Sequence, residues 1–200
     1  MSPLAISLSK YGHKVNFIAE VIMSKDRIET GWSFQDLPNV NTIILNGTKN
    51  IKSIVLSSGK DSIHICQGLR NNGKVRIAQK FIRKFGYREW IIIETVNEKQ
   101  IFGFLKKALY RILSIYHKNK IEAILAIGKN TKDWLIDRGF DKKKIFSFAY
   151  FLSNQEIDYN DNIKSKDFEF IFIGNLIKRK NIDLLLKALS YMEEKNFYLK

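Results

Sequence analysis

The sequence contains a single cysteine, which excludes a disulfide framework within the chain. Cys66 lies in the apolar stretch 62–66, so we expect a buried thiol in a protein of a reducing compartment. Histidine is scarce as well. The three histidines, His13, His64 and His117, are far apart and form no ligand-spaced pair with cysteine or carboxylate, so no metal site is expected.

Long hydrophobic runs are also absent. No apolar run approaches the roughly 18 residues that a transmembrane helix needs. Residues 1–10 place no charged segment ahead of an apolar one, so they do not have the pattern of a secretory signal peptide. We therefore expect a cytoplasmic protein, or one attached peripherally to the inner face of the cell membrane.

Acidic residues are too few to balance the basic ones. The chain has 20 Asp and Glu against 34 Lys and Arg, which gives a net charge of +14. Nucleic acid, anionic lipid headgroups and sugar diphosphates are all attracted by such a surface, and charge alone does not rank them. Because 45% of the residues are hydrophobic and 12% are aromatic, the chain can bury a core, and we expect one or two folded domains.

One kind of junction occurs three times along the chain. A helical pattern ends at a glycine, and a few polar residues then lead into a β-rich run; the glycines are Gly12, Gly86 and Gly139. A helix C-cap needs a left-handed backbone, which glycine adopts at little cost. Short β-branched or aromatic runs thus alternate with longer helical segments. This alternation predicts an α/β fold with a Rossmann-like parallel sheet and helices on both faces.

The periodicity also predicts the elements and the domain boundaries. Strands are expected near 14–18, 41–45, 62–67, 90–94, 121–127 and 144–149, and helices near 4–11, 72–85, 99–118 and 129–138. No strand precedes the first helix, so we expect the chain to begin inside a fold. Residues 152–167 are polar and locally acidic, which predicts a linker between a domain at 1–151 and the start of a second domain at 168–200.

Residues 168–189 are the most informative segment, because they have the pattern of a strand, a glycine-led basic loop and an amphipathic helix. In that geometry unpaired backbone N–H groups and the positive helix end lie beside Lys180, which suits a phosphate. Gly174 permits close backbone approach, and Lys180 and Arg179 can supply cationic contacts. A solvated, lysine-rich turn is the alternative, since no Walker or GxGxxG pattern is present.

Residues 172–189 resemble the start of the donor domain of group 1 glycosyltransferases of the GT-B fold, where a strand ends in Gly-Arg and a Lys-Gly precedes a leucine-rich helix. Two further segments resemble this family in the correct order. Residues 8–18 are similar to its first helix and second strand, and residues 124–145 to the strand, helix and glycine turn that close its first domain.

The resemblance implies a donor site in the second domain. Lys180 matches the lysine that contacts the donor diphosphate, and Gly174, Asn175 and Arg179 belong to the same expected loop. The sequence departs from the family at two positions: Asn175 replaces an arginine, and Asn181 replaces the glycine that follows the lysine.

The resemblance also implies an activity. It is the transfer of a sugar, with retention of configuration, from a nucleotide diphosphate sugar to a glycan or lipid-linked acceptor bound by the first domain, in surface polysaccharide biosynthesis. No cofactor and no metal are expected. The family's first strand would precede Met1 and its Glu, seven residues, Glu motif would follow Lys200, so we expect a fragment that is inactive alone.

Two further candidates lie in the first domain. Glu94 ends a predicted strand, where this fold places ligand-facing residues, so it is the candidate catalytic residue; capping of the next helix is an equal alternative. Gly68, Arg70 and Asn71 belong to a polar loop that suits the hydroxyls or phosphate of an acceptor, or serves as a plain connection. We interpret His64, within a strand, as a core histidine.

Two helices combine apolar and basic residues. In the helix near 99–118, we expect one apolar face to pack against the sheet, with docking on an anionic membrane as the alternative; the face is formed by Ile101, Leu105, Ala108, Leu109, Ile112 and Tyr116. A basic cluster on the helix near 72–85 would add about 1 kcal/mol per residue near such a membrane. Its members are Lys74, Arg76, Lys80, Arg83, Lys84 and Arg88.

Two rival interpretations stay open. The net charge would also fit a basic module for nucleic acid, but that requires basic and aromatic residues interleaved on an exposed surface, and most aromatic residues fall in predicted strands and apolar helix faces. We therefore expect no nucleic acid partner. The other rival is an inactive remnant of a broken gene.

Overall fold

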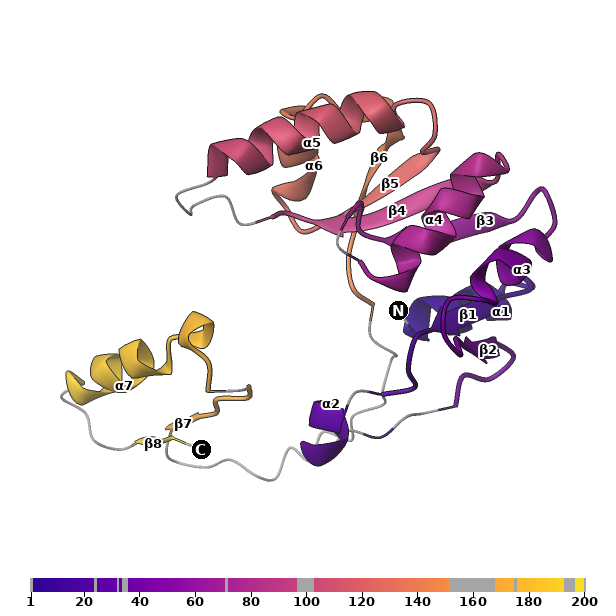
Figure 1. Ribbon diagram of the computed structural model, residues 1–200. Coiled ribbons are helices and arrows are strands. Elements are labelled where there is room, and N and C mark those ends of the chain that lie inside the picture. The colour runs from indigo at the N-terminus through magenta and orange to yellow at the C-terminus, as the bar shows by residue number, and fades with distance from the viewer. Residues whose placement is uncertain are drawn as a thin grey trace. The chain divides into compact units, whose positions relative to one another are not determined.

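The computed structural model describes residues 2–23, 25–31, 33, 36–70, 72–96, 103–151, 168–174, 176–192 and 197–199. The chain divides into two compact units, Met1–Ser153 and Asn154–Lys200, here called unit 1 and unit 2 (Figure 1). The linker predicted at 152–167 lies outside the described residues.

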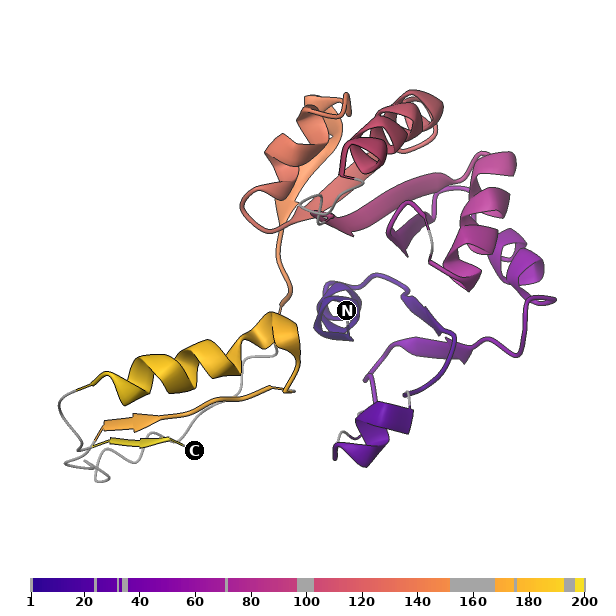
Figure 2. The same cartoon turned by 60° about the vertical axis from the view of Figure 1, so that its left-hand side comes forward.

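Unit 1 contains a four-stranded sheet in which all strands are parallel and follow chain order. Its strands are β3 (Ile63–Gln67), β4 (Arg88–Glu94), β5 (Ala123–Ile127) and β6 (Ile145–Phe148). Three helices connect them, namely α4 (Lys74–Lys84), α5 (Gly103–His117) and α6 (Thr131–Ile136), and they flank the sheet in Figure 2. The predicted α/β class and parallel, Rossmann-like sheet are thereby confirmed.

A second, two-stranded sheet lies earlier in unit 1. It pairs β1 (Asn16–Ala19) with β2 (Asn41–Ile44) in parallel, accompanied by the helices α1 (Ser2–Lys10), α2 (Lys25–Glu29) and α3 (Ile51–Leu56). Among the described residues no ladder joins this sheet to the four-stranded one. Helices α2 and α3, of five and six residues, were not predicted from the sequence.

Unit 2 pairs the strands β7 (Phe168–Phe170) and β8 (Phe197–Leu199) in parallel. A 3-10 turn, Lys178–Lys180, leads into the helix α7 (Ile182–Ser190). This is the predicted order of strand, basic loop and helix.

The core of unit 1 forms between one face of the four-stranded sheet and its helices. Ile91 of β4 and Leu135 of α6 are fully buried, and Ile82 of α4 is 2% exposed in the same cluster. Cys66 belongs to this core, and burial raises the pKa of its thiol to about 12. His64 is partly buried with Nε2 3.1 Å from Ser58 Oγ. Both residues are thus structural, as predicted.

The glycine junctions are confirmed as left-handed turns. The φ angles of Gly12, Gly86 and Gly139 are 85°, 69° and 84°. Gly139 has a second constraint, because a Cβ there would lie 3.1 Å from Oγ of Ser114 on α5. The absence of a side chain at Gly139 therefore lets α5 approach this turn closely.

The prediction of which face of α5 packs against the sheet is wrong. The buried residues of α5 are Tyr110, Ser114 and His117, and the ring of Tyr110 meets Trp134 of α6 edge to face at 4.8 Å. The residues predicted to face the sheet are instead exposed at Leu105, Ala108, Ile112 and Tyr116, half-buried at Leu109, and outside the described residues at Ile101. The buried face is thus the more polar one, with Tyr110 packed on Trp134 and Ser114 lying against the turn at Gly139.

Candidate functional site

Three polar side chains and a glycine lie where the four parallel strands of unit 1 end. Gln67 and Glu94 are the last residues of β3 and β4, Gly128 follows β5, and Tyr150 lies just beyond β6. The carboxyl ends of parallel strands meet at one edge of the sheet, and ligands of α/β proteins bind outside that edge. This edge is the candidate site of unit 1.

Glu94 and Tyr150 form a hydrogen-bonded pair at this edge. Tyr150 Oη donates to Glu94 Oε1 at 2.5 Å. The hydrogen bond to the carboxylate raises the pKa of Tyr150, and burial and the charge of Glu94 add to this. Both side chains are exposed, so a second carboxylate oxygen is accessible to a hydroxyl donor such as a sugar. The helix that Glu94 was alternatively predicted to cap would begin within residues 97–102, which lie outside the described residues.

A threonine pair links the end of β4 to the start of α6 beside Glu94. The hydroxyls of Thr95 and Thr131 lie 2.7 Å apart, and Thr131 Oγ1 also donates to the carbonyl oxygen of Ile127. Thr131 is 1% exposed, so its hydroxyl holds the loop after β5 rather than a ligand. Sequence reasoning missed Tyr150, Thr95 and Thr131, although Thr95 directly follows a predicted strand and Tyr150 lies just beyond another.

The loop after β3 is held in place by its own hydrogen bonds. Gly68 and Gly73 have φ angles of 75° and 56°, and the N–H of Gly68 donates to the carbonyl oxygen of Ile92. Asn72 Nδ2 donates to the carbonyl of Gln67 at 2.7 Å, while Asn72 Oδ1 is buried without a partner within the described part of the chain. These hydrogen bonds hold the described residues of the loop in place, and the buried Asn72 Oδ1 is not accessible to a ligand.

The other two residues predicted in this loop contribute less. The Arg70 side chain is half-buried, with no ion pair in the described residues. Asn71 lies outside the described residues. Of the predicted acceptor-side loop, only Gly68 thus has a defined role, which is to allow the positive φ that the turn requires.

An open cavity of about 620 Å³ lies where β1 and β2 end. Its lining is mainly aliphatic, with Glu20 and Asn46 among the few polar members; the apolar residues are Val21, Ile22, Met23, Ile28, Ile44 and Leu45. Glu20 forms an ion pair of 3.0 Å with Lys74 at the start of α4. The ion pair thereby links this cavity to the helix that follows the Gly68 loop.

In unit 2, the predicted phosphate loop turns sharply into α7. Gly174 follows β7, and a Cβ on Gly174 would lie 3.8 Å from Cε of Lys180, so the lysine side chain folds back toward the glycine. Lys180 is exposed. Asn181, at the N-cap of α7, has φ 55° and ψ 40°. Position 181 thus has a left-handed backbone, and group 1 glycosyltransferases have glycine at the matching position. Asparagine is one of the few other residues that adopt the left-handed conformation at modest cost.

The start of α7 has both attractive and repulsive groups for an anion. The first N–H groups of a helix lack intrahelical partners and carry partial positive charge. Asp183 lies in the same first turn and opposes an anionic ligand there. Asn175 and the side chain of Arg179 lie outside the described parts of this loop.

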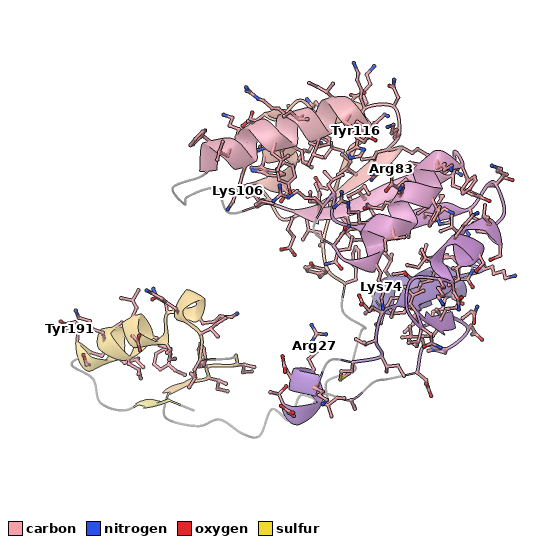
Figure 3. All side chains as sticks on the ribbon, in the orientation of Figure 1. Arg27, Lys74, Arg83, Lys106, Tyr116 and Tyr191 are labelled. Atoms are coloured by element: carbon pink, nitrogen blue, oxygen red, sulfur yellow. The ribbon has the colours of Figure 1, made fainter. Side chains whose placement is uncertain are left out.

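The basic cluster predicted on α4 is half neutralised. Lys74 pairs with Glu20, Arg83 pairs with Glu89, and Arg88 pairs with Glu122. The Arg83 pair is inside the fold: Glu89 is fully buried, and Nε and Nη2 of Arg83 donate to its two oxygens at 2.6 and 2.8 Å. Figure 3 labels Arg83 on α4. The exposed cations that carry no such pair are Arg76, Lys80 and Lys84. As an anion-binding surface, this cluster is weaker than predicted.

No protein-family model, curated protein or solved structure matches this chain. Within the described ranges, no helix has both the length and the apolar content needed to cross a bilayer. A search of the same residues finds no group of three or more His, Cys, Asp or Glu placed to hold a metal ion.

Proposed function

We propose that the chain is part of a GT-B-type glycosyltransferase that transfers a sugar from a nucleotide diphosphate sugar to a glycan or lipid-linked acceptor in building a surface polysaccharide. The observation that carries this proposal is the turn of unit 2, where Gly174, Lys180 and the left-handed Asn181 precede the N-terminus of α7. Backbone N–H groups and one flexible ammonium next to a glycine suit the compact charge of a diphosphate.

In the proposed reaction, negative charge develops on the leaving diphosphate as the glycosidic bond breaks. Lys180 and the N-terminus of α7 stabilise that charge, so catalysis is mainly electrostatic. Asn175 and Arg179 complete the donor loop in this proposal. Asp183 weakens donor binding through its charge.

The carboxyl-terminal edge of unit 1 is proposed to bind the acceptor. The free oxygen of Glu94 accepts a hydroxyl of the acceptor, with Tyr150 holding the carboxylate in place. The aliphatic cavity at the ends of β1 and β2 accommodates an apolar acceptor group. An acceptor of this kind resides in a membrane, so we place the protein in the cytoplasm, attached to the inner membrane surface.

Donor binding by the 200-residue chain is the first test. Isothermal titration with inorganic pyrophosphate and with uridine, guanosine and thymidine diphosphate sugars is expected to show binding. Lys180→Ala should weaken it by about 10- to 100-fold, the loss of one charge-assisted contact. Asp183→Asn should strengthen it, because a repulsive charge is removed. Lys187→Ala, in the last turn of the same helix, is the matched control and should leave binding unchanged.

If Lys180→Ala binds pyrophosphate as tightly as the wild-type chain, the diphosphate site is wrong. Salt-dependent binding of an oligonucleotide that pyrophosphate does not compete away would favour the nucleic acid module instead. In a complete enzyme, Lys180→Ala is expected to lower the transfer rate.

A further inference from the structure

Helix α5 has an exposed apolar face that the core of unit 1 does not use. The exposed fractions are 69% for Phe104, 51% for Leu105, 63% for Ile112, 77% for Ile115 and 62% for Tyr116. At 3.6 residues per turn, these side chains fall within about one third of the helix circumference. Contiguous apolar surface of this kind marks an interaction site.

The charges beside this face all have the same sign. Residues 103–120 contain five cations and no carboxylate; the cations are Lys106, Lys107, Arg111, Lys118 and Lys120. By helical geometry, Lys107, Arg111 and Lys118 lie together between the apolar face and the buried face. Near the C-terminal end of α5, the Nζ of Lys120 lies 3.7 Å from the ring centroid of Tyr116, whose place on the helix Figure 3 labels.

We propose that this face of α5 binds an anionic lipid bilayer. The helix lies in the plane of the interface, the apolar side chains enter the acyl boundary, and Lys107, Arg111 and Lys118 contact anionic headgroups. Charge complementarity selects this occupant. A second copy would bring two sets of five cations together, and a nucleic acid would leave the aliphatic side chains in water.

Helix α4 provides an internal comparison. Its exposed cations Arg76, Lys80 and Lys84 have no exposed large apolar side chain on the same helix. Electrostatic attraction without insertion is weaker than the two combined. The membrane alternative considered for both basic helices is therefore assigned to α5 alone.

This inference deepens the proposed function, since it identifies how the enzyme would reach a membrane-resident acceptor. Binding of α5 to lipid does not require a nucleotide diphosphate sugar, so the membrane proposal and the glycosyltransferase proposal can be refuted independently. The pyrophosphate titration of Lys180→Ala tests the diphosphate site of unit 2, whereas the vesicle experiment tests only the exposed face of α5.

The test is flotation of the 200-residue chain with vesicles of phosphatidylcholine and phosphatidylglycerol in equal parts, and with phosphatidylcholine alone. We expect binding to the anionic vesicles only, decreasing with salt. Lys107→Gln/Arg111→Gln should weaken it about 30-fold, or about 1 kcal/mol per charge. Phe104→Gln/Ile115→Gln should weaken it by at least about 10-fold, because two inserted side chains are lost.

Arg76→Gln/Lys80→Gln on α4 is the matched charge control and should retain most of the binding. All substituted side chains are exposed, so melting temperatures should not change, and this is checked by circular dichroism. The proposal is overturned by any of three results: no binding to anionic vesicles, equal losses in the α4 and α5 charge variants with none in the apolar variant, or a dimer in sedimentation velocity that the apolar variant abolishes.

Discussion

Acid is expected to destabilise unit 1 through a buried histidine at the end of α5. His117 is 3% exposed, and its ring meets that of Tyr116 edge to face at 4.8 Å. Burial, with smaller effects from the charges of Arg83 and Lys120, lowers the pKa of His117 from 6.5 to about 4. The Nδ1 atom has no hydrogen-bond partner among the described residues, so no acceptor there stabilises a proton.

The sign follows from proton linkage. Above the unfolded-state pKa of 6.5 the imidazole is neutral in both states, and folding is unaffected. Below pH 6.5, His117 binds a proton in the unfolded chain but not in the folded one. The free energy of unfolding therefore decreases as the pH falls toward the folded-state pKa of about 4. The loss should reach about 2 kcal/mol near pH 5 and about 3 kcal/mol once both states are protonated.

The assay is urea unfolding followed by circular dichroism at about pH 8 and about pH 5, for the wild-type chain and His117→Gln. The variant should lose about 2 kcal/mol less than the wild type on acidification. His64, whose pKa burial lowers, and Glu89, whose pKa burial raises, titrate in both proteins, so the difference between them isolates His117. Equal pH dependence in the two proteins would refute the reasoning.

Three further results are expected. Arg83→Ala should cost about 3–5 kcal/mol in urea unfolding because it leaves Glu89 buried without its partner, whereas Arg88→Ala, which removes an exposed pair, should cost below about 1 kcal/mol; equal costs would contradict the burial argument. Asn181→Ala should destabilise unit 2 by about 1–2 kcal/mol and Asn181→Gly should not, and a tolerated alanine would mean that the left-handed turn is unnecessary. Cys66, with a thiol pKa of about 12, should react with a disulfide reagent only on unfolding, so rapid labelling of the native chain would place it at the surface.

Helices α5 and α4 show that local sequence pattern is insufficient to predict which side chains of a helix are buried. Helix α5 has apolar residues around most of its circumference, so two faces compete for the sheet. The sequence favours the face with larger aliphatic side chains. The structure instead turns inward the face with Tyr110, Ser114 and His117, where the Tyr110 ring meets Trp134 of α6 and Ser114 lies against the turn at Gly139. Likewise, Arg83 is a surface cation by pattern, but the burial of Glu89 on β4 draws it inside.

Sequence alone determined the features that depend on neighbouring residues. The left-handed turns at Gly12, Gly86 and Gly139, the alternation of strands and helices from β3 to β6, and the burial of Cys66 follow from backbone freedom and local apolar content. Tertiary structure decided what depends on residues far apart in the chain. The Glu94–Tyr150 pair joins positions 56 residues apart, and which face of α5 is exposed depends on packing against α6 and the sheet, because such contacts exist only once the strands are aligned.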